Sequence, residues 1–381
     1  MGHSQLTRDL IRSPLLAVWG LFLLMMPLYV FPSGLPQPDD AMIVLIAPIA
    51  FSVWNGRLNR SSVRILRSLI WFTLWVIVVD LAWVVLLSNW GLDLRYPLFY
   101  VFNALVFLIV LILDQKYQDS FKRLTLYCVF VSIIVQTMFA LVQRSSSRGT
   151  VFFENPNQLG YYALLSACVI ALLQPRLKFG RVKAGIGLSC CGYLALASAS
   201  RAAVAGVAIL VMLVMFSSPR VIIIGSLLAI VLFLVGGPVA NVVDTMQSRI
   251  NTPRGDDNLT FFEQRGYDRI WTNKQYLLLG AGEGAKDRFT ETTVIKHAEI
   301  HSSVGTIFFS YGIVGLILFA VFLWRLIRTA DIRTALILIP PLAYTAAHQG
   351  LRFTMLWVLL ALFASLKPSP QPLRAQAGNH V

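Results

Sequence analysis

Long apolar stretches separated by short polar loops make up most of the chain. Stretches such as "SLIWFTLWVIVVDLAWVVLL" and "VGTIFFSYGIVGLILFAVFLW" have the roughly 20 apolar residues that a helix needs to cross a bilayer. The pattern predicts an all-α, polytopic membrane protein of about twelve transmembrane helices. Several stretches are shorter, and there we expect broken helices or helices buried within the bundle. The expected helices cover residues 15–31, 41–54, 68–87, 97–113, 124–142, 158–173, 184–198, 202–216, 221–240, 304–323, 335–349 and 353–366.

Composition supports this class of protein, and the distribution of charge orients it. The chain is 57% hydrophobic and 13% charged, whereas a soluble domain is about 25% charged. A net charge of +14 is compatible with nucleic-acid binding, but 19 of the 32 Lys and Arg residues lie in loops on the same side as the N-terminus. This bias is an orientation signal, so we expect both termini in the cytoplasm and no nucleic-acid partner.

The helices and loops divide the chain into four parts. Helices one to nine occupy residues 1–240, and a large external loop occupies residues 241–303. Helices ten to twelve follow in residues 304–366, and residues 367–381 form a Pro-containing tail that we expect to be disordered.

The external loop contains a periodic stretch with two arginines. Apolar and long side chains recur at helical spacing at Tyr267, Ile270, Trp271, Lys274, Leu277 and Leu278. The period predicts a helix lying on the membrane surface, ended by the Gly-rich turn "LGAGEG". Arg265 and Arg269 would share one face of that helix, an arrangement that favours an anion between them. Phosphate suits guanidinium because the planar fork donates two parallel hydrogen bonds.

Two further polar features stand at the external ends of helices. Arg201 follows "SAS" and opens the eighth helix; an arginine there faces a cavity or partner, or else anchors the helix at the interface. "FFENPNQLGYY" contains an Asn-Pro-Asn turn, with a helix expected from Asn157 onward. Its amides serve either the turn alone or a polar site for sugar or pyrophosphate. Asp80 is the clear acidic residue inside a predicted span.

His301 stands where the external loop enters the tenth helix. A neutral imidazole accepts a proton from a hydroxyl, which makes it a candidate general base; the alternative is a helix cap. His297, one turn earlier, is interpreted either as a structural residue or as one that supports the site without touching the substrate. Glu291 and Glu299 do not complete a zinc pattern with these histidines, so no metal or cofactor is expected. The cysteines lie in apolar stretches and are expected to be buried and free: Cys128, Cys168, Cys190 and Cys191.

Four segments resemble the superfamily of bacterial O-antigen ligases and polymerases. They are "FFENPNQLGYYALL", "SASRAAVAG", "RGYDRIWTNKQYLLLGAGEG" and "HSSVGTIFFSYGIVGLI", in the expected order over roughly residues 150–320. The resemblance implies a GT-C-like fold in the inner membrane, with the active site facing the periplasm. His301 matches the family's histidine, Arg201 the arginine of its Ser-Arg pair, and Arg265 its loop arginine. Ser302 stands where many relatives have Asn.

The resemblance further implies a metal-independent, inverting glycosyltransferase of lipopolysaccharide synthesis. A ligase of this family transfers a glycan from undecaprenyl pyrophosphate to a sugar hydroxyl of lipid A-core. His301 would be the catalytic base, and Arg201 and Arg265 would bind the pyrophosphate. Alternatives are an O-antigen polymerase with a second lipid-linked glycan as acceptor, a lipid-linked glycan transporter, and a non-catalytic assembly subunit. Further candidates for substrate contact are Arg269, Arg148, Asn155 and Asn157.

Overall fold

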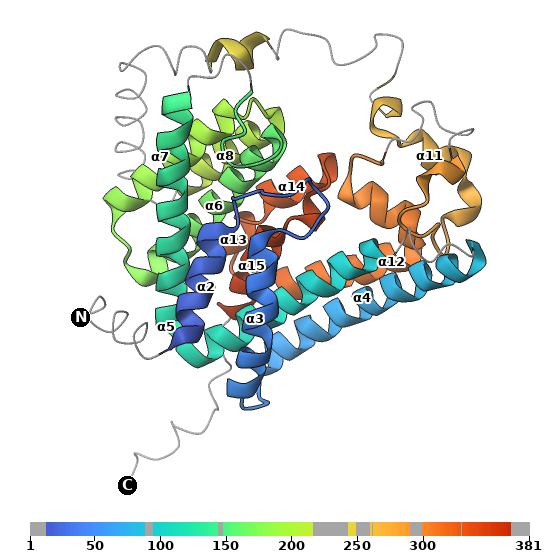
Figure 1. Cartoon of the computed structure of the whole chain (residues 1–381), viewed down its shortest axis with the longest axis horizontal. Helices are drawn as coiled ribbons and strands as arrows, with labels where there is room; N and C mark the ends of the chain where they lie inside the picture. The colour runs from blue at the N-terminus through green and yellow to red at the C-terminus, as the bar shows by residue number, and fades with distance from the viewer. Residues whose placement is uncertain are drawn as a thin grey trace.

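The described part of the chain is helical, without a strand. The structure is a computed structural model of the whole chain (Figure 1). It describes residues 13–87, 94–143, 148–215, 243–248, 260, 262–289, 299–328 and 330–366.

Four of the described helices are long and apolar enough to cross a membrane by themselves. This property confirms the prediction of a helical membrane protein, although the number of crossings stays a prediction. Helix is present in each predicted range that the structure describes, while the range 221–240 lies outside the described residues. The four long helices are α4 (Arg60–Leu87), α5 (Arg95–Gln143), α6 (Pro156–Leu177) and α12 (Ser303–Ile327).

Helix α5 consists of two arms joined at Gln118. Gln118 has φ 46° and ψ −118°, values that no helix contains. The ion pair between Asp114 and Lys122, at 2.7 Å, closes the junction. In a straight helix these residues would be about 12 Å apart along the axis, so the chain must turn back between them. The two arms correspond to the predicted helices 97–113 and 124–142.

The other helices are shorter within the described part of the chain, and α8 is described only as far as Met215. The predicted range 335–349 is divided between two of them, α13 and α14. They are α2 (Pro14–Met25), α3 (Pro38–Val53), α7 (Arg181–Ala197), α8 (Arg201–Met215), α13 (Ile332–Leu336), α14 (Ile339–Ala347) and α15 (Thr354–Ser365).

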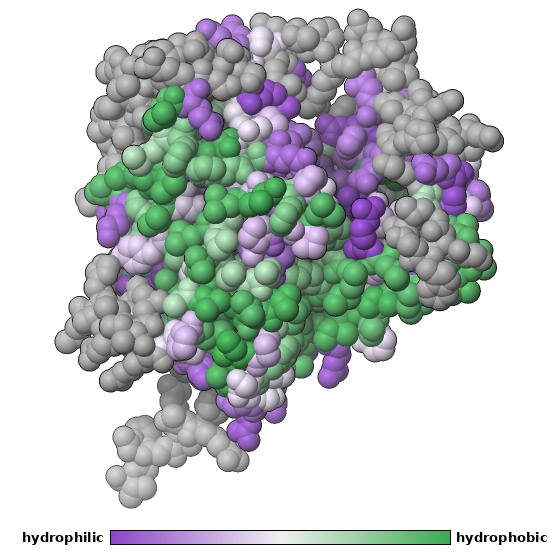
Figure 2. All heavy atoms as spheres, viewed as in Figure 1, coloured by the Kyte–Doolittle hydropathy of each residue, from purple (hydrophilic) through white to green (hydrophobic). Residues whose placement is uncertain are grey.

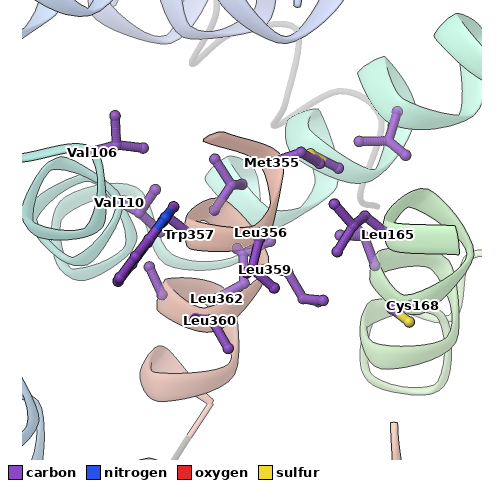
Figure 3. Close-up of a cluster of buried hydrophobic side chains, with 14 of the residues drawn as sticks. Val106, Val110, Leu165, Cys168, Met355, Leu356, Trp357, Leu359, Leu360 and Leu362 are labelled. Atoms are coloured by element: carbon purple, nitrogen blue, oxygen red, sulfur yellow. The ribbon is translucent and has the colours of Figure 1, made fainter. Parts of the chain in front are cut away.

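The centre of the bundle is formed by α15. Every residue from Met355 to Ala364 is buried, and a helix that is apolar on all sides belongs inside a protein or a membrane. Trp357 and its leucine neighbours pack against Val106 and Val110 of α5 and against Leu165 of α6 (Figure 3). The four cysteines are buried and free, as expected.

Helix α4 has an apolar face turned away from the protein. Trp71, Leu74, Val78, Leu81 and Val85 are all exposed and recur at helical spacing. Its other face, which includes Ile65, Leu69, Phe72 and Val76, is buried. Apolar residues on both faces fit a helix with protein on one side and lipid on the other. Figure 2 shows hydrophobic side chains covering the long helices, with hydrophilic ones gathered near α8, α14 and the segment that contains α11.

The predicted surface helix over residues 265–278 is wrong. The segment instead folds as three short pieces: a 3-10 turn η1 (Glu263–Arg265), α11 (Asp268–Thr272) and a second 3-10 turn η2 (Lys274–Tyr276). Gly266 separates the first two pieces with a left-handed φ of 70°. A further turn, η3 (Lys286–Phe289), follows the Gly-rich stretch. The apolar period reflects burial of residues such as Ile270 in a small separate core.

Candidate functional site

Four helix ends meet on the hydrophilic side of the bundle. Helices α6, α8 and α12 begin there and α14 ends there, and α14 packs against each of the other three. We call this region the His301 end. The structure brings six of the seven candidate residues to it and places Arg269 apart from them. The six are Arg148, Asn155, Asn157, Arg201, Arg265 and His301.

Arg148 joins the start of α6 to the turn before α8. Its Nε donates to the carbonyl of Ser198 at 3.0 Å, and a terminal nitrogen donates to the amide oxygen of Asn157 at 2.8 Å. Arg201, three residues after Ser198, is the first residue of α8 and is half-buried. Two cations therefore lie near the N-terminal ends of α6 and α8, where helix dipoles also favour negative charge.

The two asparagines of the Asn-Pro-Asn turn have different partners. Asn155 is the N-cap of α6: its side chain accepts from the backbone N–H of Gln158 at 3.1 Å. This contact is the turn chemistry that such a motif predicts on its own. The helix begins at Pro156, one residue before the expected start. Asn157 accepts from Arg148 through its side-chain amide oxygen. Its backbone carbonyl accepts from the hydroxyl of Tyr344 at 3.0 Å.

Tyr344 connects α14 to both sides of the His301 end. Its ring stacks on Tyr161 of α6 with centroids 4.2 Å apart and on His348 at 4.6 Å. The charges of Arg148 and Arg265 both act on its hydroxyl. The Tyr344 hydroxyl thus marks the point that lies within electrostatic reach of both arginines.

Arg265 and His301 are linked by two hydrogen bonds, one between their backbone groups and one from the Arg265 guanidinium. The N–H of His301 donates to the carbonyl of Arg265 at 3.0 Å. The Arg265 guanidinium donates to the carbonyl of His301 at 3.3 Å and to the carbonyl of Ala347, the last residue of α14. A cation at the C-terminal end of a helix is stabilised by the exposed carbonyls there. Arg265 therefore has a structural role at this place, whatever else it binds.

The surroundings of His301 keep its imidazole neutral. The protein packed around the side chain lowers its pKa below the ordinary histidine value, and the nearby positive charge of Arg265 lowers the pKa further. The carboxylate of Glu299 acts in the opposite direction. Because the ordinary pKa is about 6.5, His301 is neutral near pH 7. Although protein surrounds part of the side chain, His301 remains open to solvent, so its neutral imidazole is able to accept a proton.

Ser302 fixes the start of α12 directly after His301. Its hydroxyl accepts from the N–H of Gly305 at 3.0 Å, as an N-cap does. Ser303 ties the same turn to α14, because its N–H and its hydroxyl each donate to the carbonyl of His348 at 3.1 Å. Serine is among the preferred N-cap residues, so capping alone explains a serine at this position.

The expectation that Arg265 and Arg269 share a helical face is wrong, because Gly266 breaks the helix between them. Arg269 is only 5% exposed, and its guanidinium lies 5.2 Å from the centre of the Phe289 ring. It lines a small cavity together with Glu299 and Arg352. Arg269 therefore lies beside a polar cluster that includes Glu299 and Arg352.

This cluster is a series of hydrogen bonds and ion pairs that runs from the buried Asp80 to the partly exposed Glu299. Asp80 of α4, which is 0% exposed, accepts from the N–H of Glu283 at 2.8 Å and from the hydroxyl of Tyr311 at 3.1 Å. The Tyr311 hydroxyl also lies 2.9 Å from the carboxylate of Glu283. Arg352 then pairs with Glu283 and, at 3.0 Å, with Glu299. This series of contacts ends at Glu299, two residues before His301 in the sequence.

Replacing Arg352 with Gln is expected to destabilise the protein. The change leaves the buried Glu283 carboxylate without its counter-charge, and removal of one partner of a buried ion pair costs roughly 3–5 kcal/mol. Thermal unfolding in detergent would show a clear drop in melting temperature. Glu299→Gln is the matched control, since Glu299 is 33% exposed and its loss should cost far less. The double variant Arg352→Gln/Glu283→Gln should regain part of the stability; equal melting of Arg352→Gln and the native protein would contradict this account.

Sequence reasoning missed several residues of this region. Tyr344, His348 and Arg352 follow the last predicted motif, and their partners are distant along the chain. A signal existed for Arg352, which is one of only a few arginines in the predicted short external loops. The described residues include no group of three His, Cys, Asp or Glu side chains that could hold a metal ion; His297 lies outside the described residues.

Comparison with known proteins names no family for this chain. The sequence matches no protein-family model and no curated protein sequence.

Proposed function

We propose that the chain is an O-antigen ligase of the bacterial inner membrane, with its His301 end facing the periplasm. The observation that carries the proposal is the pair of hydrogen bonds that links Arg265 and His301. It sets a neutral imidazole beside a cation at the start of an apolar helix. Arg148 and Arg201 stand at the neighbouring helix starts. This combination suits an anionic lipid-linked donor and an acceptor hydroxyl.

In the proposed reaction the arginines bind the donor and the histidine activates the acceptor. Arg201 and Arg265 hold the pyrophosphate of an undecaprenyl pyrophosphate glycan and stabilise the charge that grows as it leaves. His301 takes the proton from a sugar hydroxyl of lipid A-core. That oxygen bonds to the anomeric carbon from the opposite face while the bond from this carbon to the phosphate oxygen breaks. The configuration inverts, and undecaprenyl pyrophosphate is released.

Other candidate residues take supporting roles in this proposal. Arg148 is already held by Asn157 and Ser198, so it would present a fixed positive charge to the donor. Asn157 would orient that charge, and Asn155 would fix the start of α6. Arg269 acts on the cluster behind the site. No metal or cofactor takes part in the proposed steps.

The direct test is a transfer assay with purified protein in detergent. The protein is mixed with an undecaprenyl pyrophosphate glycan and lipid A-core, without added metal or nucleotide. A second tube contains a further lipid-linked glycan in place of lipid A-core. Transfer to lipid A-core supports the ligase. Growth of the lipid-linked chain identifies a polymerase, and the absence of any new glycosidic bond in both tubes counts against enzymatic transfer and favours a transporter or an assembly subunit.

The rate of transfer should depend on pH through His301. As a general base, His301 acts only when neutral, so the rate should fall in acid with a midpoint below the ordinary histidine pKa of about 6.5. Glu299→Gln removes a charge that raises the pKa of His301. Its midpoint should therefore move to lower pH. The measurement is kcat/KM against pH for both proteins; a midpoint that moves to higher pH in the variant would contradict the assignment.

A further inference from the structure

The Gly-rich stretch of the large loop is docked on a break in α12. Gly312 has φ 68° and ψ −173°, which interrupts the helix. An unbroken helix would pair the N–H of Ile313 with the carbonyl of Phe309. Here the N–H of Ile313 donates to Leu277 at 2.8 Å, and the carbonyl of Phe309 accepts from Ala281 at 3.0 Å. The loop therefore replaces the hydrogen bonds that the break removes.

Neighbouring backbone groups are satisfied in the same way. The carbonyl of Ser310 accepts from the N–H of Gly282 at 2.9 Å, and the carbonyl of Tyr311 accepts from the indole of Trp75 at 2.8 Å. Trp83, also on α4, donates to the carbonyl of Gly280 at 3.0 Å. Irregular backbone exists at membrane depth only where protein satisfies its polar groups. In this stretch the N–H groups of Gly280, Ala281, Gly282 and Glu283 each have an acceptor in the protein.

The docking point lies well inside the apolar part of both helices. The apolar stretch of α12 begins near Val304, so Gly312 is about 12 Å further along the axis. On α4, the apolar stretch ends near Leu87, and Asp80, which binds the N–H of Glu283, is about 10 Å from that end. The contacts on α12 and on α4 thus both place the loop about 10 to 12 Å from the ends of the apolar stretches.

The tip of this stretch presents two leucines outward. Leu277 packs on the small core of the segment, whereas Leu278 and Leu279 are 64% and 59% exposed. On α12, Ile313, whose N–H donates to Leu277, and Ile317, one turn further on, are also exposed apolar residues. The two leucines therefore add to the exposed apolar residues of α12.

We propose that residues 277–284 form a re-entrant segment of the membrane, with Leu278 and Leu279 in contact with lipid acyl chains. The large loop is thereby fixed in the bilayer at the level of the Asp80–Glu283 contact. This inference does not rest on the proposed enzymatic activity.

Spin labels test the proposal in vesicles of phosphatidylethanolamine and phosphatidylglycerol. Leu278→Cys and Leu279→Cys are labelled separately; the four native cysteines are buried, so background labelling is small. Collision with oxygen, which enters lipid, is compared with collision with a water-soluble nickel chelate. Val85→Cys on α4 is the lipid-facing reference. Thr260→Cys, an exposed polar position at the start of the segment, is the reference for water.

The proposal expects the ratio of oxygen to nickel accessibility at Leu278 and Leu279 to match that at Val85 and to exceed that at Thr260 many-fold. High nickel accessibility at the leucines would overturn it, because the loop would then lie in water. Low accessibility to both reagents would also overturn it, because protein, such as a second copy of the chain, would cover the leucines. A lipid-soluble diazirine photolabel on the native protein gives a reading that needs no substitution: the peptide with Leu277–Leu279 should carry label.

Discussion

Replacing His301 with Ala should lower the rate of glycan transfer to lipid A-core by about 10²- to 10⁴-fold, the contribution typical of a general base. The protein should stay folded, because His301 is exposed and its contacts to Arg265 run through backbone atoms that alanine retains. The rate is measured with purified protein in the transfer assay, and folding by thermal unfolding in detergent.

One control variant and two further site variants separate catalysis from structure. His380→Ala, in the predicted cytoplasmic tail, should transfer at the native rate. Arg201→Ala should lose about 10²- to 10³-fold if it stabilises the leaving pyrophosphate. Arg265→Ala is a less specific probe, since Arg265 also binds the carbonyls of His301 and Ala347. Near-native transfer by His301→Ala would refute its role as base, and near-native transfer by Arg201→Ala as well would leave the ligase proposal without its site.

The helices were predictable because apolar length is a local property of the sequence. A run such as residues 68–87 is helical in any membrane context, since every backbone group must be paired within the segment. The break at Gln118 was also expected as a gap between two ranges. The pattern does not show whether an apolar helix faces lipid or protein. Both α4 and α15 contain apolar runs, yet α4 has an exposed face and α15 is the core.

The candidate site was predictable only where neighbouring residues in the sequence remain neighbours in the fold. His301 and Arg201 each stand at the start of a helix, as expected. Arg265 and Arg269 were grouped by a helical period that Gly266 interrupts, so their side chains reach different partners. Tyr344 and Arg352 joined the region only through the packing of α14 and the turn after it, which no local pattern encodes.

The role of Asp80 also depends on contacts with residues that are distant in the sequence. In the sequence it is a lone acid within a membrane span, which indicates a functional site by default. In the fold it accepts from the loop N–H of Glu283 and from the hydroxyl of Tyr311. Its carboxylate therefore secures the docked loop, and the Gly-rich stretch of that loop is its partner.

Replacing Gly312 or Gly280 with Ala should destabilise the protein severely. A Cβ at Gly312 would lie 2.3 Å from the carbonyl oxygen of Leu278, and one at Gly280 would lie 2.3 Å from that of Ser310. Both residues also have positive φ, 68° and 101°. Strain in such a conformation costs about 1–3 kcal/mol, and forced separation of packed backbone adds about 1–3 kcal/mol. Thermal unfolding in detergent should show the loss.

Substitutions at two other glycines separate the contribution of backbone strain from that of the steric contact. Gly192, inside α7, has no atom within 4 Å of its Cβ position and no positive φ, so Gly192→Ala should be neutral or slightly stabilising. Gly34 has φ +91° but open space around it, so Gly34→Ala measures strain alone. The expected order of melting temperature is Gly192→Ala highest, Gly34→Ala intermediate, and the two docking glycines lowest. If Gly312→Ala melted no lower than Gly34→Ala, the loop would not be held against α12, and the re-entrant segment would lose its anchor while the assignment of His301 would stand.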